Sequence, residues 1–153
     1  MTGRSKDGTF TQKGGKNFFG YKQHSSHGVD MPLVREFVIT SASMHDSRVD
    51  LSIPGMPCYR DMGYQSAPCR GFNATMDRAS RNTPLTMKQV RRNLRISRKR
   101  TPGERPYSVI KRVQNGEHTL VTMVRRVCVK MTFVNMAYNL STVVHLKRRG
   151  IIA

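Results

Sequence analysis

The chain has 153 residues, enough for one domain with a core of moderate size, and its 27 lysines and arginines against 9 acidic residues give a formal net charge of +18. Apolar residues make up 37% and aromatic residues 7%, which is low for a compact enzyme but too high for a fully disordered chain. A field of this sign attracts polyanions, so nucleic acid is the first partner to consider and an acidic membrane surface the second.

The cysteines and the hydropathy pattern limit where the protein can act. Cys58, Cys69 and Cys128 are an odd number without C-x-x-C spacing, so the sequence supports neither a disulfide framework nor a zinc knuckle. The N-terminus lacks an apolar signal segment, and no run of about 18 apolar residues follows it. We therefore expect a soluble cytoplasmic protein with no membrane partner.

The positive charge is concentrated in the second part of the chain. Residues 61–153 carry nineteen basic and four acidic side chains, and therefore +15 of the +18. Between Arg78 and Arg112 there are twelve basic side chains and a single acid, Glu104. We expect this stretch to follow a phosphate backbone. The expected DNA-binding side chains are Arg91, Arg92, Arg95, Arg98, Lys99, Arg100, Arg105 and Lys111.

The first half of the chain has strand patterns. Residues 1–16, rich in Gly, Lys, Thr and Ser, are typical of a flexible N-terminal arm without a strand. Two β-type runs at residues 17–24 and 33–40 predict a β-hairpin. A short helix is expected near Asp46, and residues 56–61 predict a brief strand that ends at a carboxylate.

The second half has helical patterns. Thr83, followed by proline, predicts the start of a basic helix. Thr101 and Glu104 form a Thr-x-x-Glu capping box for a second helix. Apolar side chains spaced by three or four predict a long helix over Leu120–Leu146, with its methionines in the core. Residues 148–153 are read as a basic tail.

Two carboxylates are candidates for chemistry. Asp61 follows a short strand, where a carboxylate can hold a divalent metal, although many such aspartates only cap a turn. Glu104 has an equally simple interpretation as the capping-box glutamate. On a continuous helix Arg100 and Lys111 would share its face, a pattern also typical of a solvated helix with i,i+4 ion pairs.

Five short motifs follow one another in a fixed order: FFGYKQH at 18–24, VITSASMHDS at 38–47, YRDMGYQSAP at 59–68, Arg100 with Glu104 and Lys111, and AYNL at 137–140. This ordered set, from about Lys13 to about Leu140, resembles the prokaryotic insertion-sequence transposases of the DDE type. The resemblance implies an α/β, partial RNase H-like fold, with a β-hairpin, a short strand and C-terminal helices, and a truncated catalytic domain over residues 17–147.

The resemblance also implies a reaction. Asp61 matches the family's second catalytic aspartate and Glu104 its catalytic glutamate, two of three carboxylates that hold a pair of Mg²⁺ or Mn²⁺ ions. Two such metals activate water or a 3′-hydroxyl for in-line phosphoryl transfer. The implied function is DNA transposition by metal-dependent cleavage and strand transfer, with element ends and target DNA as partners, a place on the nucleoid and no small-molecule substrate.

One position near the glutamate departs from the family. A Tyr, Arg, Glu and Lys signature surrounds that residue, and Arg100, Glu104 and Lys111 match its spacing. Ser97 stands at the tyrosine position. Because the signature's cations are thought to engage DNA near the cleavage point, this departure affects a contact to terminal DNA more than it affects metal binding.

A larger departure concerns the first catalytic aspartate. In the family it lies on a hydrophobic strand upstream of the hairpin, whereas Asp7 has no apolar strand to occupy and is read as a loop residue. We infer that the chain begins after that strand, whose loss leaves neighbouring strand edges unpaired. The expectation is a marginally folded, inactive chain unless a second copy or the missing N-terminal part completes it.

Other interpretations stay open at this point. A small basic RNA-binding or ribosomal protein has the same length and charge and needs neither Asp61 nor Glu104. A catalytically incomplete fragment could also regulate a full-length transposase. His24 and His27 form an H-x-x-H motif, but an extended strand does not place both on one face, and Asp46 is read as a helix cap.

Overall fold

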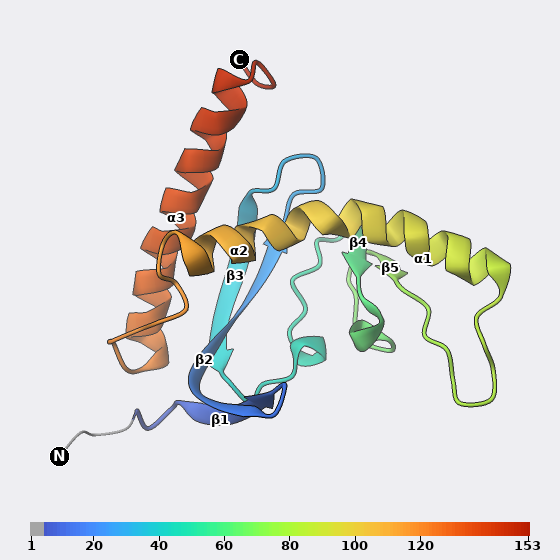
Figure 1. Ribbon diagram of the computed structural model, residues 1–153, viewed down its shortest axis with the longest axis horizontal. Coiled ribbons are helices and arrows are strands. Elements are labelled where there is room, and N and C mark those ends of the chain that lie inside the picture. The colour runs from blue at the N-terminus through green and yellow to red at the C-terminus, as the bar shows by residue number, and fades with distance from the viewer. Residues whose placement is uncertain (1–4) are drawn as a thin grey trace.

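A computed structural model describes residues 5–153, so the first four residues of the expected N-terminal arm lie outside the described part. The fold is mixed α/β, with two small sheets and three α-helices in this range (Figure 1). The strands are β1 (Thr9–Lys13), β2 (Lys16–His27), β3 (Val34–Ser41), β4 (Pro57–Arg60) and β5 (Phe72–Thr75). The helices are α1 (Met87–Arg100), α2 (Arg105–Arg112) and α3 (Val124–Arg148), with 3-10 turns η1 (Asp46–Arg48), η2 (Met62–Tyr64) and η3 (Thr101–Glu104).

The first sheet is antiparallel, in the order β1-β2-β3. The predicted hairpin is confirmed, since β2 pairs with β3 from Tyr21 to His27. The prediction that residues 1–16 contain no strand was wrong, because β1 pairs with the first residues of β2. Gly14 and Gly15 have φ angles of 56° and 76°, which allow the two-residue turn that folds β1 back.

The second sheet joins β4 and β5 in parallel. The brief strand expected at residues 56–61 is confirmed as β4, whereas β5 was not predicted, because four residues that include an asparagine carry little strand signal. Buried Arg60 closes the connection between them by donating to the carbonyls of Pro68 (2.8 Å) and Ala67 (3.4 Å).

Two strands have an edge without a strand partner. Within residues 5–153, the Tyr21–His27 part of β2 has no strand partner opposite β3, and β4 has none opposite β5. In Figure 1 the upper end of β2 lies to the right of β3, with β4 and β5 further right and the segment that contains η1 between β2 and β4, whereas the lower part of β2 crosses to the left of β3.

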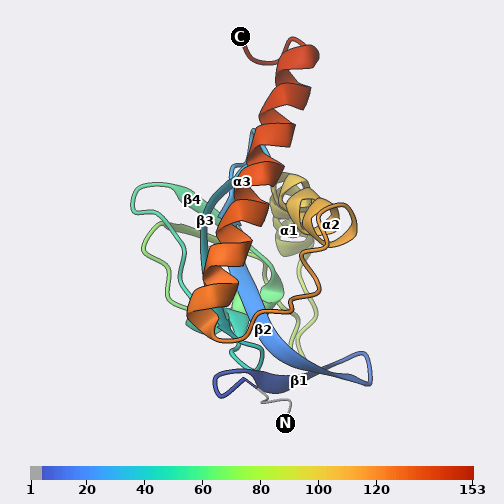
Figure 2. The ribbon, with the colours of Figure 1, turned by 90° about the vertical axis from the view of Figure 1, so that its left-hand side faces the viewer.

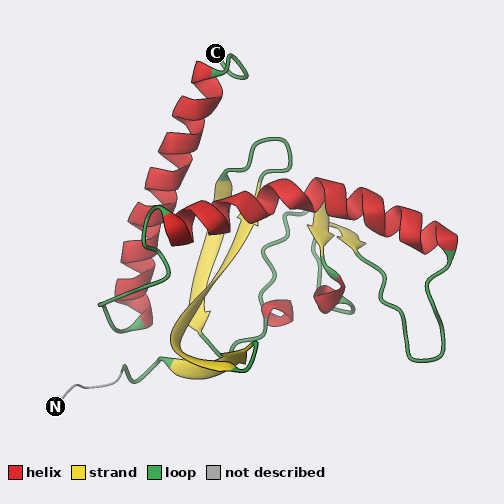
Figure 3. Ribbon diagram, in the orientation of Figure 1, coloured by secondary structure: helices red, strands yellow, loops and turns green. Residues whose placement is uncertain are grey.

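The basic helix starts later than expected. Thr86, not Thr83, is the N-cap of α1, because Thr86 and Gln89 form a reciprocal capping box, while Thr83 lies in a short bridge with Ser80. The capping box predicted at Thr101 is also wrong: its hydroxyl donates to the Ser97 carbonyl at 3.0 Å. Consequently α1, η3 and α2 form one nearly continuous rod (Figure 3).

The core lies where α3 packs against the first sheet and α2. The long C-terminal helix is confirmed, although it begins at Val124 and leaves Leu120 fully exposed. The Tyr138 hydroxyl donates to the Pro32 carbonyl at 2.7 Å. Figure 2 shows α3 lying along the sheet and extending past it. The buried cluster is Val34, Ile39, Ile110, Val127, Met131 and Tyr138.

The outer face of α3 is apolar and exposed. Of the three methionines placed in the core by the sequence pattern, Met131 is buried, whereas Met123 and Met136 are 47% and 50% exposed. Phe133 and Leu140 are also more than half exposed. Even so, no helix in the described part of the chain is long and apolar enough to cross a bilayer.

Candidate functional site

Asp61 lies immediately after β4. Its Oδ1 accepts a hydrogen bond from the Gly63 backbone N–H at 2.9 Å, which makes it the N-cap of η2. The predicted position at a strand end is therefore confirmed. The capping role occupies one carboxylate oxygen, and the side chain is partly accessible to solvent. A strand that stops at a partly exposed carboxylate is a suitable place for a metal ligand.

Glu104 is the last residue of η3 and its side chain is 67% exposed. Arg100 Nη2 lies 3.0 Å from Glu104 Oε1, so the expected i,i+4 ion pair forms. Lys111 does not join it: its Nζ lies 3.7 Å from Glu117 Oε1. The 3-10 turn between α1 and α2 winds more tightly than an α-helix and so breaks the periodicity on which the shared face was predicted.

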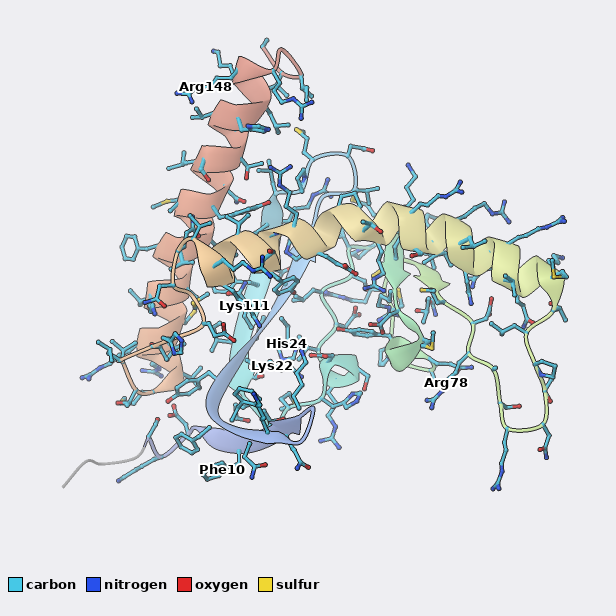
Figure 4. The ribbon with its side chains drawn as sticks, in the orientation of Figure 1. Phe10, Lys22, His24, Arg78, Lys111 and Arg148 are labelled. Atoms are coloured by element: carbon cyan, nitrogen blue, oxygen red, sulfur yellow. The ribbon has the colours of Figure 1, made fainter. Side chains whose placement is uncertain are left out.

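A polar cluster connects β2 with η1. Asp46 Oδ1 lies 3.0 Å from Lys22 Nζ and 3.1 Å from His24 Nδ1, and His24 Nε2 lies 2.8 Å from Thr40 Oγ1. The His24 bond, followed by that of Lys22, lowers the pKa of Asp46 to about 2. Asp46 is therefore not the predicted cap, since His45 Nδ1 accepts from the first turn of η1. Figure 4 shows Lys22 and His24 projecting from β2.

This cluster lies close to Asp61, because η1 and η2 contact each other. Burial raises the pKa of the Tyr64 hydroxyl, and the negative charges of Asp46 and, more weakly, Asp61 add to the shift. Sequence reasoning missed the cluster, although Lys22 and His24, two residues apart on a strand, share one face by simple alternation.

The described residues do not complete a metal site. Within residues 5–153, no three His, Cys, Asp or Glu side chains come together so that they could hold an ion. Asp61 and Glu104 offer the oxygen ligands that Mg²⁺ and Mn²⁺ prefer. The donor chemistry therefore fits a divalent ion, but the number of donors does not.

Asp7 was read as a loop residue, and the structure gives it a structural role. Its carboxylate accepts from the Tyr21 hydroxyl (2.8 Å) and from the Val124 backbone N–H (2.7 Å). Hydrogen bonds from Ser5, Val124 and Tyr21 lower the pKa of Asp7 to about 2. The residue thus ties the N-terminal segment to the start of α3, where a negative charge is favourable.

His27 joins the end of β2 to the rod that carries Glu104. The His27 ring meets the Tyr107 ring edge-on at 5.2 Å, and Ser25 Oγ donates to the Tyr107 hydroxyl at 2.7 Å. Burial lowers the pKa of His27 to about 4, so the ring is neutral at pH 7. His24 and His27 therefore serve different contacts.

Basic side chains form a stripe on the exposed face of α1, opposite its buried residues Asn93 and Ile96. No described carboxylate forms an ion pair with any member of the stripe. Cations that are not paired with a carboxylate are available to contact phosphates. The α1 stripe consists of Lys88, Arg91, Arg95 and Arg98, which line one open groove together with Leu94.

The other predicted DNA-binding residues divide into three groups. Arg92 donates to the Thr75 carbonyl (2.8 Å) and to Asp77 (2.9 Å), so it holds α1 against the second sheet. Arg100 and Lys111 face carboxylates, as described above. Lys99 and Arg105 are exposed. No local pattern indicates that Arg92 has an internal partner, because Asp77 is distant along the chain.

Comparison with known proteins identifies the family. The family described as transposase DDE domain matches residues 1–140. The chain is 30% identical over 121 residues to the transposase for insertion sequence element IS1106 of Neisseria meningitidis serogroup B, across 71% of this chain and 42% of that protein. The chain thus spans about two fifths of that relative. No solved structure matches this chain. The match does not favour a ribosomal or other RNA-binding protein, and the chain belongs to the DDE transposases of insertion sequences.

Proposed function

We propose that this chain binds DNA along the α1 stripe and contributes Asp61 and Glu104 to a catalytic site that cuts and joins DNA at element ends. The observation that carries the proposal is the continuity of α1 with η3, because one rod bears both the free cations and Glu104. A duplex that follows the stripe is led toward this carboxylate. The catalytic unit corresponds to residues 17–147, and the DNA partner places the protein on the nucleoid.

The third carboxylate of the proposed site comes from outside the described residues. The unpaired edges of β2 and β4 support this, because an added strand can pair with either edge, and one paired with β4 would run beside Asp61. A mixed sheet extended in this way is the RNase H-like arrangement that the family resemblance implies. The added strand belongs either to a further segment of the same protein or to a second copy.

The roles of the individual side chains follow from their contacts. Asp61 and Glu104 would hold Mg²⁺ or Mn²⁺, which supplies Lewis-acid activation of water or a 3′-hydroxyl when bound. Arg100 lies 3.0 Å from Glu104 and keeps the exposed carboxylate oriented until a metal competes for it. The Asp46 cluster fixes η1 against β2, and η1 in turn contacts η2, the turn that Asp61 caps.

The test compares two triple variants of equal charge change. Arg91→Gln, Arg95→Gln and Arg98→Gln are expected to reduce the slope of log affinity against log salt by about 2.7 for duplex DNA, since each phosphate contact contributes roughly 0.9. Arg125→Gln, Arg126→Gln and Arg149→Gln, exposed on and after α3, serve as the control. Equal slopes for both variants would show that the α1 stripe is not the DNA interface.

The catalytic part of the proposal is tested in an assembly in which the chain is supplied with the third carboxylate. There, Asp61→Asn and Glu104→Gln should each abolish strand cleavage in Mg²⁺ or Mn²⁺ while leaving duplex affinity within about twofold. Retained cleavage by either variant would remove that carboxylate from the proposed site.

A further inference from the structure

The hairpin at residues 9–20, made of β1 and the start of β2, exposes three of the chain's six phenylalanines. Phe10, Phe18 and Phe19 are 58%, 48% and 42% exposed. Burial of an aromatic side chain is favourable, so a cluster of exposed rings on one short hairpin marks a surface that binds something. Figure 4 shows Phe10 at the outer edge of the molecule.

One face of this aromatic hairpin carries a ring pair. Phe10 and Phe19 are directly opposite in the register, and their ring centroids lie 4.9 Å apart. Gly8 lies against the Phe19 ring, since a Cβ there would be 3.0 Å from Cζ. Alternation along the strands places Gln12 and Asn17 on the same face, nearer the tip. The face therefore combines flat apolar rings with amide donors and acceptors.

The other face carries positive charge beside the third ring. Lys13 and Lys16 are cross-strand partners and share a face with Phe18. Two like charges directly opposite each other destabilise a hairpin. Neither lysine forms an ion pair with any carboxylate of residues 5–153. An anion bound between them would relieve this repulsion.

The base of the hairpin is fixed to the rest of the molecule. Thr9 Oγ1 donates to Ser43 Oγ at 3.0 Å and accepts from the Ser43 backbone N–H at 2.9 Å. Asp7 and Tyr21 tie both strands to the start of α3. The hairpin is therefore held in place before any ligand binds, which lowers the entropy lost on binding.

We propose that the aromatic hairpin binds single-stranded DNA. Unpaired bases stack on Phe10 and Phe19, and phosphates of the same strand contact Lys13 and Lys16. Base stacking needs an exposed base face, which a duplex hides, so the hairpin selects unpaired nucleotides where the α1 stripe takes duplex. This inference rests on the proposed function, since it assigns single-stranded DNA to a protein proposed to bind DNA.

The first experiment measures binding of the full chain to a 12-nucleotide oligothymidylate and to a 12-base-pair duplex by fluorescence anisotropy. Phe10→Leu with Phe19→Leu keeps apolar bulk and removes both rings. We expect at least a tenfold loss of affinity for the single strand and less than a twofold change for the duplex. The matched control, Phe72→Leu with Phe133→Leu, removes two exposed rings elsewhere and should change neither.

The second experiment tests the lysines. Lys13→Gln with Lys16→Gln should reduce the salt slope for the single strand by about 1.4, from roughly 0.7 per phosphate. Unchanged single-strand affinity in the Phe10→Leu, Phe19→Leu variant would overturn the inference and assign the rings to an apolar polypeptide partner. An equal loss of affinity in the control variant would also overturn the inference. The proposed function fails on a different result, namely an unchanged salt slope for duplex binding in the α1 stripe variant. The two failures are therefore distinguishable.

Discussion

The molecule has an apolar half, made of the first sheet, α2 and α3, and a polar half, made of the second sheet and α1. Different kinds of contact stabilise each half. The first sheet, α2 and α3 share an apolar cluster around Tyr138 and Met131. The second sheet and α1 are tied by polar contacts: Asn93 accepts from the Asp77 N–H (2.8 Å) and donates to its carbonyl (2.9 Å), while Arg92 holds the Thr75 carbonyl. Within residues 5–153, Ile96 is the buried apolar side chain of that half.

This difference indicates which half is the more rigid and where the proposed catalytic residues lie relative to it. Apolar packing is cooperative, so the half with the cluster should open only in global unfolding, whereas the polar half should open locally at lower free energy. Asp61 and the α1 stripe both belong to the polar half. A half that opens locally at low free energy can rearrange to accept DNA and an additional strand.

The largest expected effect is in the apolar half. Tyr138→Ala should lower the free energy of unfolding by roughly 3–5 kcal/mol, because it removes a buried ring from the centre of the cluster. Urea denaturation followed by circular dichroism measures it. Tyr138→Phe is the control, since it removes only the bond to the Pro32 carbonyl and should cost about 1 kcal/mol. If the alanine variant lost no more than the phenylalanine variant, the contrast between the halves would disappear.

The next effect is also in the apolar half, where His27 of β2 contacts Tyr107 of α2. His27 has a folded pKa of about 4 against an ordinary value of 6.5, so the unfolded chain binds the extra proton between these pH values. Stability is therefore full above pH 6.5 and falls as pH drops toward 4, by roughly 3 kcal/mol in total. Urea midpoints between pH 7.5 and 4.5 measure this, and His27→Gln should flatten the profile. A slope that survives the substitution would assign the titration to another group.

A smaller effect is expected in the polar half. Asn93→Ala should cost about 1–3 kcal/mol, because it leaves the partly buried backbone groups of Asp77 without these partners. Hydrogen exchange should accelerate in β4, β5 and α1 while protection in α3 stays unchanged. Arg95→Ala, exposed on the same helix, is the control. Equal acceleration in α3 would mean that the two halves unfold as one unit.

The smallest effect belongs to the Arg100–Glu104 ion pair. A double-mutant cycle with Arg100→Ala and Glu104→Ala should give a coupling of about 0.3–0.5 kcal/mol that salt weakens, because both side chains are partly or largely exposed. Thermal melts at low and high salt measure the coupling. A coupling above about 1 kcal/mol would mean that the pair contributes to stability, in contrast with the role in orientation proposed above.

Periodic segments were predictable from sequence, and the elements that depend on distant partners were not. Two β-type runs predicted β2 and β3, and helical spacing predicted most of α3. Strand β5 was not predicted because four residues are too few to show a periodic pattern. A long connection also separates it from its partner β4. The start of α1 was misplaced because Thr83 with proline and Thr86 with Gln89 both resemble a helix start, and tertiary contacts decide between them.

The candidate site was predictable in part. Local spacing indicated that Asp61 ends a strand and that Glu104 pairs with Arg100, and the family resemblance supplied their proposed roles. The Asp46 cluster and the His27 contacts join segments far apart in sequence, so no local pattern reveals them. The interruption of the helix at η3, which separates Lys111 from Glu104, follows from a 3-10 turn that a helical wheel does not anticipate.

The exposed apolar face of α3 makes the response of this protein to ionic strength two-sided. At low salt, like charge keeps copies of the chain apart and colloidally stable despite Phe133 and Leu140 at the surface. At high salt the Debye length shrinks and the apolar faces can meet. We therefore expect the high-salt buffers that remove bound nucleic acid also to favour aggregation of the protein.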